Sequence, residues 1–259
     1  MARKKYIGKP CPYCGKSDVS ATRDHVVAKE FFLKEDRANL PVVPACSPCN
    51  GAKSTLEHYV LSVLPFGNRH VEAHCYAQRN IERRLRKNRS LRGELTFEQS
   101  RLWERHPNGL LVPTIQLKID AQKVTDLFAL IVRGLFNYHW QDILTADWVA
   151  DIKLIHPAHE TYVIGPLMPY FAQPAAIAEN DLGRGTFVYR GLRSKHIPQI
   201  SLWQFTLFGG LQFGADAKFP EGRFTKFTAI TRQTKAAAQA TRTRVKEAKW
   251  KSADKEAAP

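Results

Sequence analysis

The chain has 259 residues, 44% of them hydrophobic, which is typical of one large or two smaller globular domains and excludes a wholly disordered protein. Its 39 lysines and arginines outnumber 24 aspartates and glutamates, and the net charge of +15 favours a polyanion such as nucleic acid as partner. The basic N-terminus lacks a following apolar run, and the longest apolar stretch, residues 124–136, contains charged residues. We therefore expect a cytoplasmic protein with neither a secretory signal nor a membrane span.

Two C-x-x-C pairs dominate the N-terminal part of the chain. Cys11 and Cys14 form the first pair, Cys46 and Cys49 the second, and turn-forming residues surround both. Because a chain without an export signal keeps its cysteines reduced, the pairs predict one structural zinc with four thiolate ligands and no open coordination position. The remaining cysteine, Cys75, is interpreted as a small buried apolar residue.

The segments between and after the two cysteine pairs change from extended to helical. Residues 19–27 are rich in β-branched side chains and predict a strand that contains the pair Asp24-His25. Residues 40–45 hold two prolines and predict a second extended segment. Residues 52–64 place apolar side chains at i, i+3, i+4, i+7 and i+8, which predicts a helix. The expected order is therefore strand, loop, strand, helix.

The same segments carry residues suited to hydrolysis. Neighbouring residues of a strand point to opposite faces, so Asp24 can bind a cation while His25 faces a water molecule. A neutral imidazole suits the activation of water, and the carboxamide oxygens of Asn39 and Asn50 suit Mg²⁺ or Mn²⁺. Taken singly, an Asp-His pair is also a common structural feature, and Asn39 can simply cap the loop.

Residues 11–57 resemble the HNH nucleases, a family with a ββα-metal fold, in the subtype that carries a four-cysteine zinc. His25, Asn39 and Asn50 match the three positions of the family name, and residues 46–53 are similar to its C-x-x-C-[HN]-x-x-K element. The resemblance implies that His25 is the general base, that Asn39 orients it, and that Asn50 and the aspartate beside the base hold the catalytic Mg²⁺ or Mn²⁺. The loop after the Asp-His pair lacks the Gly-Gly turn of many relatives.

Cationic side chains near this module are candidates for binding phosphate. Residues 79–92 carry seven lysines and arginines against one glutamate and predict a basic helix, with a solvated surface helix as the alternative. Lys53 is either a phosphate contact or an exposed helical lysine, and His58 is interpreted as a surface residue. The candidates for contact with nucleic acid are Lys53, Arg83, Arg84, Arg86 and Lys87.

The rest of the chain predicts a mixed body. Residues 120–144 have the clearest helical pattern, interrupted by Gly134, which we expect to mark close packing. Strands are predicted at 112–119, 161–164, 186–189, 200–208 and 210–213. Three tryptophans are interpreted as core residues, with stacking on unpaired bases as the alternative: Trp140, Trp148 and Trp203.

The sequence as a whole predicts an α+β protein in four parts. These are a nuclease module, a basic helical connector, an α+β body with antiparallel strands, and a basic flexible tail, at residues 1–65, 66–109, 110–230 and 231–259. We expect a metal-dependent endonuclease that cuts DNA, alone, as a homodimer or with a partner protein; a role in anti-phage defence is a hypothesis by analogy. The alternative is a zinc-ribbon nucleic-acid-binding adaptor, which has no need for Asp24, His25 and Asn50 together.

Overall fold

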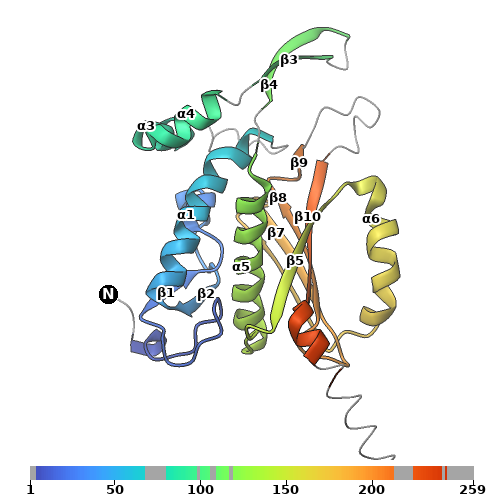
Figure 1. Cartoon of the computed structure of the whole chain (residues 1–259). Helices are drawn as coiled ribbons and strands as arrows, with labels where there is room; N and C mark the ends of the chain where they lie inside the picture. The colour runs from blue at the N-terminus through green and yellow to red at the C-terminus, as the bar shows by residue number, and fades with distance from the viewer. Residues whose placement is uncertain are drawn as a thin grey trace, which may run out of the picture.

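The computed structural model describes residues 4–67, 80–97, 100–105, 109–116, 119–212, 224–240 and 243. Helices and antiparallel strands are mixed within this part of the chain, as the sequence predicts (Figure 1). Cys75 lies outside the described residues. No helix of the described part is long and apolar enough to cross a membrane.

The N-terminal segment has the predicted order of strand, loop, strand and helix. Strand β1 (Thr22–His25) pairs antiparallel with β2 (Val42–Ala45), and α1 (Ser47–Val63) follows. Helix α1 begins earlier than the predicted residue 52, because Pro48 in its first turn already has the helical φ angle. Short 3₁₀ helices complete the segment: Lys4–Tyr6, Lys29–Phe31, Lys34–Asp36 and Leu64–Gly67.

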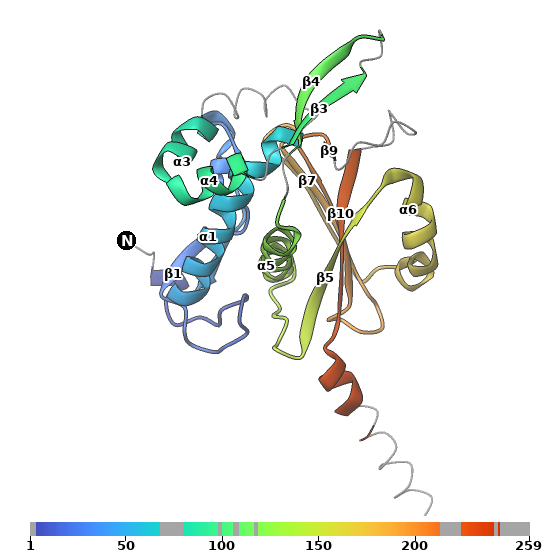
Figure 2. The ribbon, with the colours of Figure 1, turned by 45° about the horizontal axis from the view of Figure 1, so that its top comes forward.

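The basic segment forms two helices in place of the predicted single one (Figure 2). Helix α3 (Glu82–Lys87) ends at Asn88, whose backbone N–H donates to the carbonyl of Arg84. The Asn88 side chain accepts a hydrogen bond of 3.0 Å from the N–H of Leu91, which starts the next helix. Helix α4 (Arg89–Phe97) and a hairpin of β3 (Ser100–Arg105) and β4 (Leu111–Gln116) follow.

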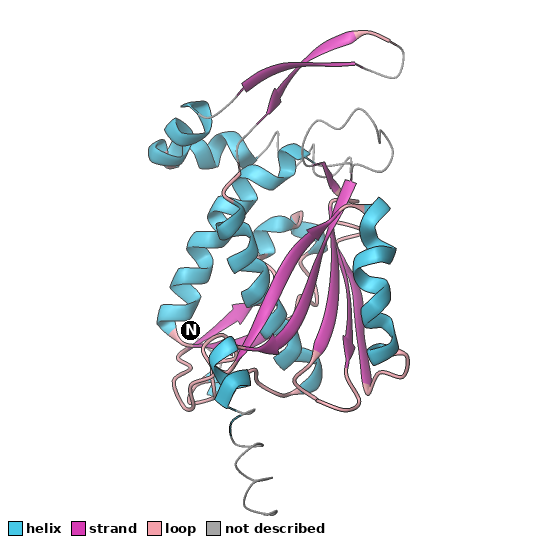
Figure 3. Cartoon of the chain, turned by 45° about the vertical axis from the view of Figure 1, so that its right-hand side comes forward, coloured by secondary structure: helices cyan, strands magenta, loops and turns pink. Residues whose placement is uncertain are grey.

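The body is a six-stranded antiparallel sheet with a helix on each face (Figures 1 and 3). Helix α5 (Ala121–Trp140) covers one face and α6 (Pro157–Ile164) the other, and a 3₁₀ helix (Gly165–Phe171) follows α6. The strand order is β5-β10-β8-β7-β6, with β9 paired to β10. The strands are β5 (Trp148–Ile155), β6 (Ala176–Leu182), β7 (Phe187–Arg193), β8 (Ser201–Leu207), β9 (Leu211–Gln212) and β10 (Phe224–Gln233).

Alternation along β8 divides its side chains between the two faces. Phe205 points to the α5 face, where Phe128 stacks on Phe227 with ring centroids 4.0 Å apart. Leu202 points to the α6 face and packs with Ile164 of α6. Trp203 is fully buried and Trp140 and Trp148 pack against the same core, which confirms the core interpretation.

Helix α5 also packs against the N-terminal segment on its other side (Figure 1). A Cβ placed on Gly134 would lie 2.7 Å from Cγ1 of Val26, so a glycine is required for this approach, as the sequence predicts. One continuous buried cluster runs from Cys11 to Ala229. The segments 1–65 and 110–230 therefore share a core.

Several predicted elements are wrong in type or extent. Residues 161–164 are the end of helix α6 and not a strand, because His156 caps the helix and Pro157 opens it. Strands β3, β5, β6 and β10 lie where no strand was predicted, and β3 falls within the connector that was predicted as helical. Strand β10 runs to Gln233 and a helical segment occupies residues 235–240, so the start of the predicted flexible tail is ordered.

Candidate metal centre and active site

The four paired cysteines meet at one point, on the loop before β1 and the first turn of α1. One sulfur atom from each of Cys11, Cys14, Cys46 and Cys49 lies within 4.8 Å of the others, and the Cys14 and Cys46 sulfurs are 4.0 Å apart. A tetrahedral zinc with bonds of about 2.3 Å requires sulfurs about 3.8 Å apart. The cluster can therefore hold a zinc ion with only small movements.

Two features around this cluster favour charged sulfurs, although burial raises the pKa of Cys11 and of Cys49. The backbone N–H of Cys46 donates to Sγ of Cys11 over 3.5 Å, a hydrogen bond that favours a charged sulfur. The Arg133 guanidinium is close enough for favourable charge interactions with Cys11, Cys14 and Cys49. Four thiolates fill a tetrahedral zinc, so this ion would have a structural role only.

Tyr13 links the cysteine loop to Asp24. It lies between Cys11 and Cys14, is buried, and donates a hydrogen bond of 2.5 Å from its hydroxyl to Oδ2 of Asp24. Burial, followed by the charge of Asp24, holds the pKa of Tyr13 well above its usual value, so the phenol remains a donor at neutral pH. The orientation of Asp24 therefore depends on the loop that contains the first two cysteines.

Lys53 of α1 is the second partner of Asp24, and its side chain is fully buried. Its ammonium group lies 2.9 Å from Oδ2 of Asp24, donates to the carbonyl of His25 over 2.8 Å, and pairs with Glu57 one turn further along α1. Three acceptors thus match its three N–H donors. Burial outweighs the attraction of Lys53 and raises the pKa of Glu57 to about 7.

This position differs from both sequence-based interpretations of Lys53. An exposed helical lysine is wrong, because the side chain has no exposed surface. Contact with a phosphate would require the ammonium group to leave Asp24, Glu57 and the carbonyl of His25. Its amphipathic stem and charged head instead connect α1 to the end of β1.

His25 ends β1, next to Asp24 and opposite Val42 of β2. Asp24 is buried between β1 and α1, whereas the side chain of His25, the next residue, is half-exposed. Partial burial lowers the pKa of His25, an effect that outweighs the opposing charge of Asp24. A neutral imidazole is the form that can accept a proton from water.

Asn50 lies on the same side of β1 as Asp24. Its side-chain nitrogen donates a 3.1 Å hydrogen bond to Oγ1 of Thr22, two residues before Asp24, which leaves the Asn50 side-chain oxygen available. Asn39 is exposed and lies just before β2 with a φ of 59°, in the left-handed region that asparagine tolerates. Its side chain has no hydrogen bond to another described residue.

The oxygen atoms of Asp24 and Asn50 have the right chemistry for a hard divalent cation. Their side chains share the interface between β1 and α1. One carboxylate oxygen of Asp24 is, however, already bound by Tyr13 and Lys53. A cation at Asp24 would therefore meet the positive charge of Lys53, and only one carboxylate oxygen is open to it in this conformation.

Sequence reasoning missed Tyr13, the burial of Lys53, and Glu57. The i,i+4 spacing of Lys53 and Glu57 is a signal for their ion pair, but it does not reveal that the pair is buried. Tyr13 carries no sequence signal beyond its place between two cysteines. Both roles depend on how α1 and the cysteine loop pack against β1.

The other candidate nucleic-acid contacts all lie on α3. Arg83 and Lys87 are exposed, and Arg86 is paired with Glu82 at the surface. Arg84 is only half-exposed, and its charge contributes to a lowered pKa of His58, for which burial is the larger cause. Helix α3 lies beside the C-terminal half of α1 (Figure 2).

Comparison with protein-family models, with curated proteins and with solved structures gives no match to this chain. The geometry of its residues is therefore the basis for assigning a function.

Proposed function

We propose that the chain is a nuclease of the HNH type that hydrolyses phosphodiester bonds, with DNA as the expected substrate. The observation that carries the proposal is a strand–strand–helix unit in which the two strands lie between the two halves of a four-cysteine cluster. Asp24 and Asn50 share one interface of this unit, and His25 lies beside them. The net charge of +15 supports a polyanionic substrate.

His25 is the proposed general base. Burial lowers the pKa of its half-buried imidazole, which favours the neutral form that can take a proton from an attacking water. Asp24 and Asn50 would hold the Mg²⁺ or Mn²⁺, whose chemistry when bound is to stabilise negative charge on the phosphate. Lys53 fixes the backbone at His25 through its hydrogen bond to that carbonyl.

A plasmid-nicking assay tests this proposal. Zinc-loaded protein is expected to nick supercoiled plasmid when Mg²⁺ or Mn²⁺ is added and to stop when EDTA is added, and His25→Ala is expected to reduce the rate by at least about 100-fold, as for loss of a general base. Lys153→Ala, which removes an exposed lysine from the sheet, is the matched control. Nicking by His25→Ala at the wild-type rate would show that the base is assigned wrongly.

The second candidate function is a zinc-ribbon nucleic-acid binder without catalysis. The ion pair between Asp24 and Lys53 favours it, because this carboxylate already has a cationic partner inside the protein. The same assay separates the two functions. A wild-type chain that binds DNA but never nicks it with either cation is a binder, and the hydrolase is then excluded.

A further inference from the structure

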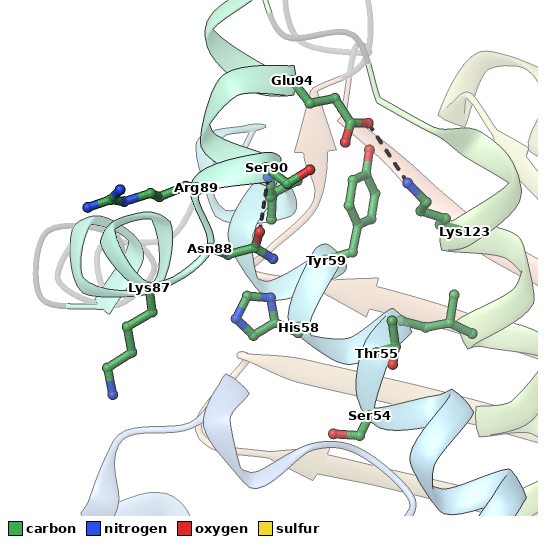
Figure 4. Close-up of a pocket in the computed structure, with 12 residues that line it drawn as sticks. Ser54, Thr55, His58, Tyr59, Lys87, Asn88, Arg89, Ser90, Glu94 and Lys123 are labelled. Atoms are coloured by element: carbon green, nitrogen blue, oxygen red, sulfur yellow. Dashed lines mark hydrogen bonds and ion pairs between the residues drawn. The ribbon is translucent and has the colours of Figure 1, made fainter.

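A pocket of about 700 Å³ with a mixed polar and apolar lining opens beside α1 (Figure 4). It is formed by one side of α1, the junction of α3 and α4, and the first turn of α5. Its polar lining combines hydroxyl, imidazole and amide groups with three cationic side chains, among them Ser54, His58, Lys87, Asn88, Arg89 and Lys123. None of the functions assigned above uses this pocket.

A row of residues on α1 connects the pocket to the candidate active site. Asn50, Ser54 and His58 are spaced at i, i+4 and i+8, so they follow one another along the same side of the helix. At 1.5 Å per residue, Ser54 lies about 6 Å and His58 about 12 Å from Asn50 along the axis. A linear ligand that contacts Asn50 and follows α1 therefore reaches the pocket directly.

The charges at the pocket favour an anionic ligand. Lys87 and Arg89 are exposed and have no ion-pair partner among the described residues, whereas Lys123 is paired with Asp120 at 3.3 Å and with Glu94 at 3.8 Å. Among the described residues, the rim therefore carries two positive charges without an ion-pair partner, while Asp120 and Glu94 together exceed the charge of Lys123 by one negative charge. Exposed positive charges are the usual means of attracting phosphate groups.

The pocket interior presents hydrogen-bonding groups and no free aromatic face. The side chains of His58 and Asn88 point toward one another in Figure 4. Because Oδ1 of Asn88 accepts from the N–H of Leu91, its side-chain nitrogen remains as a donor. The ring of Tyr59 is covered by Lys123, whose ammonium group is 4.5 Å from the ring centroid. These groups suit phosphate and sugar oxygens better than a stacked base.

We propose that this pocket binds the sugar–phosphate backbone of the strand that lies across Asn50, about three to four base steps away at 3.4 Å per step. The identity of the ligand as a nucleic-acid strand rests on the proposed function. Lys87 and Arg89 neutralise phosphates at the rim, and His58 and Asn88 contact backbone oxygens inside. The site requires no base-specific contact and is independent of sequence.

Binding of a fluorescein-labelled duplex of about 20 base pairs tests the proposal, measured by anisotropy over a salt series in the non-cleaving His25→Ala background. Neutralising the rim by Lys87→Ala and Arg89→Ala is expected to weaken binding about tenfold and to reduce the salt slope by about 1.8, or 0.9 per lost phosphate contact. The control, Lys153→Ala with Arg190→Ala, removes the same number of positive charges from side chains that are 65% and 58% exposed on the sheet, where they pair with Asp151 and Glu179. It is expected to change affinity less than twofold.

If both double variants lose the same DNA affinity, the attraction is spread over the surface. If the rim variant keeps its affinity, the pocket does not contact the DNA. Either result overturns the inference. Its outcome is separate from that of the proposed function. If the wild type nicks DNA and the rim variant binds DNA normally, the proposed nuclease function stands and the proposed role of the pocket is wrong. If the rim variant binds DNA more weakly but the wild type never nicks it, the pocket belongs to a non-catalytic nucleic-acid binder.

Discussion

At the scale of single residues, the Asp24 carboxylate is the centre of the N-terminal segment. It is buried, and its two partners come from the cysteine loop and from α1. A buried charge is tolerated only when its partners remain, because removal of one partner leaves the other charge in an environment without water. A variant that removes only one member of the Asp24–Lys53 pair should therefore have a much lower free energy of unfolding than the wild type.

Lys53→Met is expected to lower the free energy of unfolding by about 3–5 kcal/mol, because it leaves the buried Asp24 and the partly buried Glu57 without their cation. The measurement is urea unfolding of the zinc-loaded protein at pH 7, followed by tryptophan fluorescence. Tyr13→Phe, which removes only one hydroxyl from Asp24, is expected to cost about 1 kcal/mol.

Adding Asp24→Asn to Lys53→Met should recover part of the lost stability, since the unpaired carboxylate is then gone. A double variant less stable than Lys53→Met, or a Lys53→Met chain as stable as the wild type, would contradict the buried pair.

Sequence predicted those parts of the candidate site whose residue spacing determines which side chains meet. The cysteine spacing predicted a cluster that can bind zinc, because two C-x-x-C loops have few other ways to pack. The partners of Asp24 could not be predicted, because Tyr13 and Lys53 reach it from segments whose relative position is set by tertiary packing.

At the scale of elements, α5 is the helix on which both halves of the protein pack. Its strong apolar pattern made the helix predictable. The glycine in that pattern also predicted the close contact that Gly134 makes with Val26. The second half of helix α6, residues 161–164, was predicted as a strand because Thr161, Val163 and Ile164 are β-branched, but the cap at His156 and Pro157 determined the local structure. Strand β6 has four exposed positions among seven and shows little apolar alternation to detect.

Gly134→Ala is expected to destabilise the protein by about 1–3 kcal/mol, since the new methyl group would overlap Val26 and this cost exceeds the gain of about 1 kcal/mol in helix propensity. Gly93→Ala in α4 is the matched control, because no atom lies within 4 Å of its added Cβ, and it should stabilise by up to about 1 kcal/mol. Thermal unfolding of both variants measures the difference. Similar stabilisation by both would disprove the close contact.

At the scale of the whole molecule, the continuous core joins the candidate nuclease module to the body. Val26, Val60 and Val63 belong to the same buried cluster as Phe205 and Phe227 of the sheet. The four parts predicted from composition describe where charge and apolar content change along the chain. They do not show which parts bury one another, because long-range packing leaves no periodic pattern in the sequence.

A fragment of residues 1–67 is therefore expected not to fold stably, even with an equimolar amount of zinc, because removing α5 exposes the apolar side of the module. Proton–nitrogen correlation spectra of the fragment and of the full chain provide the measurement, with the full chain under identical conditions as control. A well-dispersed spectrum from the fragment would show that the module is autonomous.

Tyr13 has a practical consequence for any attempt to block this protein. The phenol that orients Asp24 belongs to the loop held by Cys11 and Cys14. A reagent that alkylates those sulfurs, or removes a zinc ion bound there, would disturb this loop and leave Asp24 with Lys53 as its remaining partner, without contact with the side chain of His25. Under the proposed function, such inhibition would not be competitive with DNA.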